Sequence, residues 1–216
     1  MKIFLGNSPW RKKGFYGVRA GSRWPHFERD ESGYMPFPFF LAYAAAVLEK
    51  DGQDVCLVDG IAEDLTPEQF LDRVVEFKPD LVLLEVSTSS SKVDEQMGRQ
   101  IKERLPETRL AYSGLNVFMY SPKFLEETPY VDYVLEGEYE YTLRDLVRGL
   151  NDKKDLSDCL GLYFRKDGAG FYTGKRPLIS DLDQLPWPSR EQLPMMKYHD
   201  CPGGIPEPSL QIHSSR

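Results

Sequence analysis

The sequence predicts a doubly wound α/β fold built on a parallel sheet of five strands. Short apolar runs alternate along the chain with amphipathic segments of helical length, and this alternation is typical of βαβ units. Crossovers between parallel strands are right-handed, so helices are expected on both faces of the sheet. We expect the Rossmann-like or flavodoxin-like strand order 2-1-3-4-5.

Five apolar runs are assigned to the strands of this sheet. Continuous apolar runs, rather than alternating ones, are typical of strands that are covered on both faces. The runs are residues 1–5, 55–58, 81–86, 110–112 and 133–135.

The helices between these strands are marked by apolar spacing and by end signals. Leu41, Ala44, Ala45 and Leu48 have the i, i+3, i+4, i+7 spacing of a helix over residues 39–50, and Gly52 suits its end. Residues 66–69, Thr-Pro-Glu-Gln, have the form of a capping box that begins the next helix. Further helices are expected over residues 92–105, from residue 121, and over residues 143–150.

Outside the repeating units the pattern changes twice. Residues 6–35 are rich in Gly, Arg and aromatic residues and have no clear periodicity, which is typical of a functional or disordered loop. Residues 160–165 and 170–173 predict a β-hairpin, and the Pro-rich residues 179–188 predict a linker or strap. We therefore divide the chain into an α/β domain (1–151), a hairpin appendage (152–177) and a linker (178–216). The strand-like end at 208–216 leads us to expect that the natural polypeptide continues.

Composition excludes several classes of function. The net charge of −7 argues against a nucleic-acid surface. No apolar run is long enough to span a membrane and the N-terminus lacks signal-peptide features, so we expect a cytoplasmic protein. The three cysteines show no Cys-x-x-Cys spacing, and Cys56 is expected to be an inert core residue. The sequence has no G-x-G-x-x-G after the first strand, no Walker A motif and no G-x-S-x-G elbow.

Small and polar residues follow three of the predicted strands directly. They are the hydroxyls of residues 87–91, the Ser113-Gly-Leu-Asn116 segment, and Gly137 beside Glu138. Ligands of open parallel sheets bind beyond the carboxyl ends of the strands. Hydroxyl and main-chain groups there suit a large, flat ligand rimmed by amides, and glycines allow it to approach the backbone. Taken singly, Gly114 and Gly137 favour tight turns alone, whereas the three segments together favour a ligand-binding edge.

Five segments, in their order and spacing, resemble the N-terminal cobalamin-binding region of cobalamin-dependent radical SAM enzymes. These segments are residues 36–52, 86–90, 112–116, 136–142 and 179–188. The resemblance implies a corrin ring resting on the ends of strands 1, 3, 4 and 5. The residues it implies as cobalamin neighbours are Asn7, Ser8, Pro9, Ser87, Thr88, Ser89, Ser113, Gly114, Leu115, Asn116, Gly137 and Glu138.

In that family, a segment like residues 208–216 leads into a Cys-x-x-x-Cys-x-x-Cys motif that holds a [4Fe-4S] cluster. The resemblance therefore implies that the cluster and S-adenosylmethionine belong to a radical SAM domain beyond Arg216, which would be this domain's partner. The parent protein would be a methyltransferase or an oxidative cyclase acting on a small molecule. No catalytic residue and no protein metal site is assigned to the chain itself.

Two departures from the family pattern stand out. The D-x-H-x-x-G motif that supplies a cobalt ligand in many cobalamin domains is absent, and only His26 lies in the corresponding loop, as a candidate ligand or an ordinary loop histidine. Ser113-Gly114 stands where relatives tend to carry Gly-Gly. Two other functions stay open: a cofactor-free structural or docking domain, and an α/β glycosyl- or nucleotide-binding enzyme.

Overall fold

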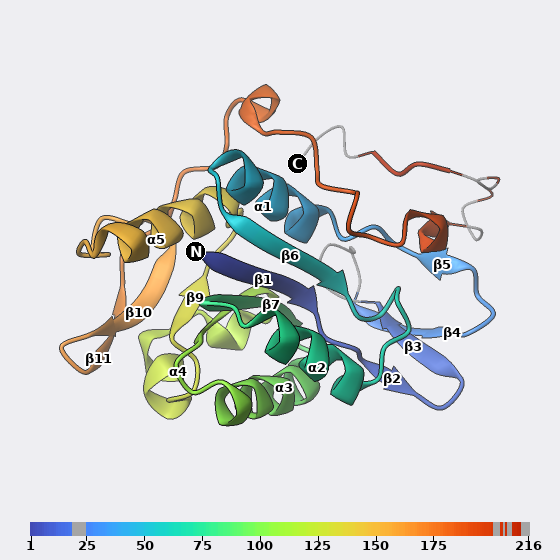
Figure 1. Ribbon diagram of the computed structural model, residues 1–216, viewed down its shortest axis with the longest axis horizontal. Coiled ribbons are helices and arrows are strands. Elements are labelled where there is room, and N and C mark those ends of the chain that lie inside the picture. Colours follow the sequence, from blue (N-terminus) through green and yellow to red (C-terminus); the bar gives the residue numbers. More distant parts are fainter. Residues whose placement is uncertain (19–24, 201–203, 205, 207–208, 213–216) are drawn as a thin grey trace.

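A central sheet of seven strands organises the computed structural model, which describes residues 1–18, 25–200, 204, 206 and 209–212 (Figure 1). The strand order is β6-β1-β7-β8-β9-β10-β11, and the first five of these strands are parallel. The predicted order 2-1-3-4-5 is therefore confirmed. The parallel strands are β1 (Lys2–Asn7), β6 (Asp54–Asp59), β7 (Leu81–Ser87), β8 (Arg109–Leu115) and β9 (Tyr133–Leu135).

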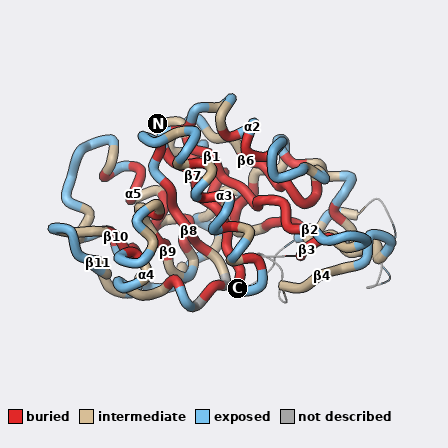
Figure 2. The backbone as a smooth tube through the Cα atoms, turned by 90° about the horizontal axis from the view of Figure 1, so that it is seen from below, coloured by how far each residue is buried: buried red, intermediate tan, exposed pale blue. Residues whose placement is uncertain are grey.

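Helices cover both faces of the sheet and enclose two apolar cores. One core is formed with α1 and α5, and the other with α2, α3 and α4. Figure 2 shows the buried part of the chain running through the central strands, with exposed segments outside. The helices are α1 (Phe39–Lys50), α2 (Pro67–Phe77), α3 (Ser91–Arg104), α4 (Pro122–Glu127) and α5 (Glu140–Asp152).

Strand β7 explains why the sequence pattern is easy to interpret. All seven of its residues are buried. Because side chains alternate along a strand, Leu81 and Leu83 enter the α1/α5 core, whereas Val82 and Leu84 enter the opposite core. A strand covered on both faces must be apolar throughout, which gives the continuous run seen in the sequence.

The predicted hairpin is present and continues the central sheet. Strand β10 (Leu162–Lys166) pairs with β11 (Ala169–Tyr172) and also lies antiparallel against β9. The two turn residues, Asp167 and Gly168, have φ values of 52° and 85°. Positive φ at both positions matches the right-handed twist of the flanking strands.

Residues 6–35, expected as a loop without periodicity, contain short strands instead. Strands β2 (Arg11–Lys12), β3 (Phe15–Val18) and β4 (His26–Arg29) form a separate small sheet, and β5 (Tyr34–Met35) pairs with β12 (His199–Asp200). We call residues 11–18 and 25–29 the arm. Trp10 fixes it to the end of β1, because its ring packs on Phe27 at 4.5 Å and occupies the space beside Gly17. Strands of two to four residues are too short to show a period in the sequence.

The segment 178–200, which we call the strap, runs back over α1 and the edge of β6 (Figure 1). The Gln192 side chain accepts from Leu57 N at 2.9 Å and donates to Val55 O at 3.1 Å. It thereby pairs backbone groups at the open edge of the sheet, a position that proteins commonly protect. The strand-like end expected at 208–216 is not a strand over residues 209–212, and the rest of that end lies largely outside the described residues.

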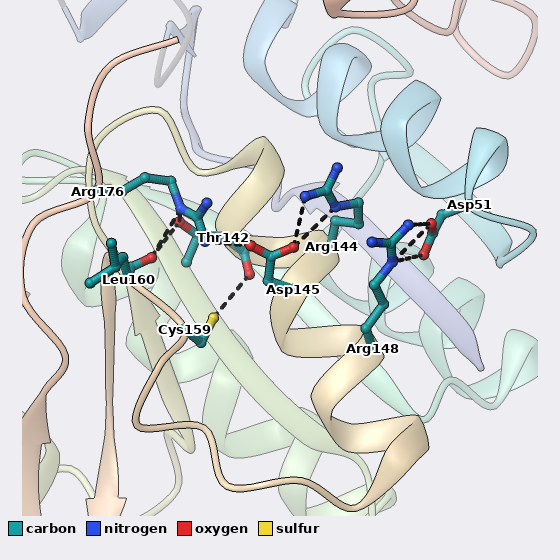
Figure 3. A network of polar contacts seen from close by, with 8 residues as sticks. All are labelled: Asp51, Thr142, Arg144, Asp145, Arg148, Cys159, Leu160 and Arg176. Carbon is teal, nitrogen blue, oxygen red and sulfur yellow. Dashed lines mark hydrogen bonds and ion pairs between the residues drawn. The ribbon is translucent and has the colours of Figure 1, made fainter.

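Polar contacts join helix α5 to α1 and to the segment after the hairpin (Figure 3). Arg148 Nε donates to both oxygens of Asp51 at 3.0 Å, which joins α5 to the end of α1. Arg176 donates to Asp145 at 2.6 Å and to Thr142 at 2.8 Å, which joins α5 to the segment after the hairpin. Of these contacts, the one between Arg176 and Thr142 holds the first turn of α5.

In the part of the chain that the structure describes, none of the helices has both the length and the apolar character needed to cross a bilayer.

The capping box at the start of α2 is confirmed and provides a first test of the fold. Gln69 N donates to Thr66 Oγ1 at 3.2 Å, and Thr66 N donates to Gln69 Oε1 at 2.8 Å. Replacing Thr66 with Ala should lower the free energy of unfolding by about 1 kcal/mol, because one helix-end N–H loses its acceptor. Thr66→Ser keeps the hydroxyl and should stay close to wild type in urea denaturation. Equal loss in both variants would contradict this account of the cap.

Candidate functional site

The carboxyl ends of four neighbouring strands form the candidate site. Strands β1, β7, β8 and β9 are adjacent and parallel, so their ends lie along one edge of the sheet. This ligand edge brings together segments that are far apart in the sequence. The segments are residues 7–9, 87–89, 113–116 and 137–138.

The residues predicted for this edge differ in how far they are exposed. Asn7, Ser8, Pro9, Ser87, Ser113 and Asn116 are buried, Gly114 and Glu138 are half-buried, and Thr88, Ser89 and Gly137 are exposed. Leu115 pairs with Ser87 in the register of β7 and β8. The surface of the edge is therefore formed by turn residues between anchored neighbours.

A buried carboxylate in the first turn of α3 connects two of the edge loops. Asp94 is fully buried and accepts hydrogen bonds from Ser8 Oγ and, at 2.6 Å, from Ser90 Oγ. Ser90 Oγ in turn lies 2.7 Å from Ser87 Oγ. Asp94 was not predicted from the sequence, because an acidic residue in the first turn of a helix is common and gives no separate signal.

A second set of polar residues, which we call the polar row, crosses four strands on the α1/α5 face. Asn7 of β1 pairs with Asp59 of β6, and Glu85 of β7 pairs with Ser113 of β8. Asn7 and Glu85 are also neighbours, because the residues just before them, Gly6 and Leu84, pair with each other. All four side chains of the row are at least 97 % buried. The members are Asp59, Asn7, Glu85 and Ser113. Each of them lies two residues after an apolar residue of the α1/α5 core and therefore on the same face of the sheet. These apolar residues are Leu57, Leu5, Leu83 and Ala111.

Two tyrosines from distant segments hydrogen-bond the carboxylates of the polar row. Tyr139, at the start of α5, donates to Glu85 Oε1 at 2.6 Å, and Tyr198 of the strap donates to Asp59 Oδ2 at 3.1 Å. Burial raises the pKa of Tyr198, and the neighbouring Asp59 carboxylate raises it further. The Tyr198 phenol therefore stays protonated and acts as a donor. These pairs were not predicted from the sequence either, because the partners are 54 and 139 residues apart.

Asn7 is a member of the polar row whose side-chain oxygen has spare hydrogen-bonding capacity. Its Oδ1 is buried and has no hydrogen-bond partner among the described residues. A small cavity of about 10 Å³ lies beside it, lined in part by Asp59 and Val18. An unsatisfied buried acceptor costs free energy, so a donor that reached Asn7 Oδ1 would lower that cost.

The end of β8 has a backbone shape that requires glycine. Gly114 has a φ of 116°, a conformation that other residues rarely adopt, and its carbonyl accepts from the Tyr120 hydroxyl. Asn116 Oδ1 accepts from Phe118 N at 3.2 Å, which fixes the following 3₁₀ turn η1 (Val117–Met119). The Phe118 side chain is 75 % exposed beside this end of the sheet, while Met119 is buried beneath it.

At the end of β9, one residue is exposed to solvent and the next is hydrogen-bonded to another part of the chain. Gly137 has a φ of 69° and is exposed, and a Cβ built on it would meet nothing within 4 Å. The Glu138 carboxylate accepts from Ile179 N at 2.9 Å, which joins the edge to the start of the strap. Of these two predicted neighbours, Gly137 offers open space and Glu138 binds the chain itself.

The described histidines and cysteines have ordinary structural surroundings. His26 belongs to β4, where its ring contacts the Glu28 carboxylate and stacks on Tyr34. Burial raises the pKa of Cys56 and of Cys159 to about 11, so neither thiol is activated. Cys201 and His213 lie outside the described residues. Within the ranges that the structure describes, no group of three or more His, Cys, Asp or Glu side chains could hold a metal ion.

Comparisons with known proteins show which family this fold and edge belong to. The fold and the edge define an open α/β ligand-binding domain, and the family model described as "B12 binding domain" matches residues 29–147. The chain belongs to the B12-binding domain family. This confirms the resemblance noted from the sequence at the level of the family.

Two curated relatives show how the chain relates to longer proteins. An uncharacterized methyltransferase of Pyrococcus horikoshii is 33% identical over 162 residues, covering 74% of this chain and 35% of the relative. The anaerobic magnesium-protoporphyrin IX monomethyl ester cyclase of Rubrivivax gelatinosus is 30% identical over 194 residues, covering 84% of this chain and 33% of the relative. The chain thus spans about a third of the length of these relatives.

Solved structures share the fold. The cobalamin-dependent S-adenosylmethionine radical enzyme OxsB, with aqua-cobalamin and S-adenosylmethionine bound, matches with a TM-score of 0.67 at 19% identity. That match covers 87% of this chain and 24% of OxsB. The radical S-adenosylmethionine methyltransferase TsrM from Kitasatospora setae, with cobalamin and a [4Fe-4S] cluster bound, has a TM-score of 0.59 at 15% identity, covering 88% of this chain and 31% of TsrM.

The Tyr139–Glu85 pair gives a direct test of the polar row. Tyr139→Phe removes one donor from a fully buried carboxylate and should lower the free energy of unfolding by about 1–3 kcal/mol. Tyr141→Phe is the matched control, because Tyr141 is two residues on and its ring can still stack with Arg144. Urea denaturation should show little change in the control. A Tyr139→Phe variant as stable as wild type would refute the role assigned to this hydrogen bond.

Proposed function

We propose that this chain is the cobalamin-binding module of a B12-dependent radical SAM enzyme. The observation that carries the proposal is the ligand edge, where four parallel strand ends meet and offer hydroxyls, glycine backbone and an unsatisfied amide oxygen. Membership of the B12-binding domain family supports cobalamin as the ligand.

The residues at the edge fit a corrinoid in three respects. Asn7 Oδ1 is a buried acceptor without a described partner, and corrin side chains carry amide N–H donors. Gly137 leaves open space where any side chain would protrude, so a bulky ring can approach the backbone. Thr88 and Ser89 are exposed hydroxyls that can donate or accept along the same edge.

The chemistry of the parent protein belongs to its other domains. Bound cobalamin would supply methyl transfer or assist an oxidative cyclisation, carried out with a [4Fe-4S] and S-adenosylmethionine domain outside this chain. Both reaction classes occur among the names of the curated relatives, a methyltransferase and a cyclase. The residues of this chain bind and orient the corrinoid, and the parent's small-molecule substrate is met elsewhere.

A second candidate function is a cofactor-free docking domain of a radical SAM protein. The strap favours it, because Trp187 and Met196 are 83 % and 80 % exposed. Large exposed apolar side chains are typical of interaction surfaces when they form a contiguous patch. This function predicts that the protein binds no corrinoid.

Reconstitution with hydroxocobalamin separates the two functions. Protein incubated with hydroxocobalamin and desalted should keep a corrin absorption spectrum at about one equivalent. Desalted protein that shows no corrin absorption would support the docking domain and overturn the cobalamin module.

A matched pair of glycine variants tests whether the ligand edge is the binding site. Gly137→Leu places a bulky side chain at the edge and should weaken cobalamin binding at least about tenfold in a spectral titration. Gly168→Leu is the control, because Gly168 also has a positive φ and open space around it but lies in the hairpin turn. Backbone strain is comparable in the two variants, so equal affinities would place the binding site elsewhere.

A further inference from the structure

The hydrogen bonds of Asp94 link the loop after β1 to the loop after β7. Ser8 belongs to the first loop and Ser90 to the second, and both hydroxyls donate to the Asp94 carboxylate from fully buried positions. We call Asp94, Ser8, Ser90 and Ser87 the carboxylate clamp. Its members come from three different segments, and Ser8 and Asp94 are 86 residues apart in the sequence.

The donors and acceptors of the clamp are fixed, because a carboxylate only accepts hydrogen bonds and both serine hydroxyls must donate to it. The single proton of Ser90 Oγ is donated to Asp94 at 2.6 Å, which is shorter than its alternative contact with Ser87 O at 3.3 Å. Ser87 Oγ, 2.7 Å from Ser90 Oγ, is therefore the donor in that contact. Hydrogen bonds to a charged acceptor are the stronger kind, so this arrangement is favoured over its reverse.

The same contacts shape the loop after β7. Ser90 N donates to Ser87 Oγ at 3.2 Å and Ser87 N donates to Ser90 Oγ at 3.1 Å. The two buried serines thus close a short turn, and the residues between them, Thr88 and Ser89, are exposed at the ligand edge. Anchoring at both ends holds this turn in one conformation.

The backbone of Asp94 is fixed independently from the other side of α3. The Tyr112 hydroxyl donates to the Asp94 carbonyl at 2.9 Å. Gly98 makes this approach possible, since a Cβ there would lie 2.3 Å from the Tyr112 hydroxyl oxygen. The carboxylate is therefore supported by β8 as well as by the two loops that it joins.

We propose that Asp94 is a positioning residue that holds the loops after β1 and after β7 ready for the corrinoid. The inference rests on the proposed function, because both loops belong to the ligand edge. Without the carboxylate, two buried hydroxyls lose their acceptor and the loops must reorganise when the ligand binds. Ordering a loop during binding costs affinity, and a loop that is held in advance avoids that cost.

Variants at Asp94 test this role through affinity and loop dynamics. Asp94→Leu removes both acceptor oxygens and should weaken hydroxocobalamin binding at least about tenfold in a spectral titration. Asp94→Asn keeps the shape and one acceptor oxygen and should restore binding to within about threefold. Glu95→Leu is the control on the adjacent exposed residue, which pairs only with Arg99 among the contacts described, and its affinity should match wild type.

Affinities are compared only between folded variants. The titrations are therefore made at a temperature at which circular dichroism shows that each variant is in the native state. Should Asp94→Leu fail to fold, Ser90→Ala removes one donor of the clamp and should weaken binding in the same direction. In cofactor-free protein, amide hydrogen exchange in residues 8–10 and 87–90 should rise in the Asp94→Leu variant. A role in stability alone would lower the melting temperature without changing affinity or local exchange in the native state.

The outcomes distinguish the two proposals. If wild type binds cobalamin and folded Asp94→Leu binds it equally well, the positioning role is overturned while the cobalamin module stands. Unchanged exchange in both loops would overturn the clamp as well. If wild type itself retains no cobalamin, the proposed function falls, and the positioning role toward that ligand falls with it.

Discussion

The shared direction of β1, β7, β8 and β9 is the constraint on which the rest of the structure depends. Because these strands are parallel neighbours, their carboxyl ends meet at one edge. The chain leaves the sheet at each of these four strand ends, and small or polar residues follow there. Helices cover both faces of the sheet, so this edge is where main-chain groups of the central strands come within reach of a ligand.

Hydrogen bonds to three buried carboxylates tie the edge to other elements of the fold. Asp94 joins two loops through hydroxyls, Glu85 is held by Tyr139, and Asp59 is held by Tyr198. Each pair connects the sheet to a different element: α3, α5 and the strap. Since a buried carboxylate without donors is costly, these contacts have to be present before any ligand arrives. Asn7 Oδ1 is a further buried acceptor at the same edge, with no hydrogen-bond partner among the described residues.

The sequence predicted the strands, helices and strand order because those depend on local patterns. Strand β7 is buried on both faces and appears as an apolar run, and α2 begins at a capping box. The candidate edge followed from the same logic. The carboxylate clamp could not be predicted, because Asp94 resembles any acidic residue near a helix start and its donor Ser8 is distant in the sequence. The arm was missed because its strands are shorter than a detectable period.

Amide hydrogen exchange, measured with and without hydroxocobalamin, tests the central claim most directly, because it maps where the ligand lies. The account predicts slower exchange on binding in residues 7–9, 87–89, 113–116 and 137–138 together, with the amino ends of the same strands unchanged. Protection confined to the arm, the strap or the amino ends of the strands would contradict it.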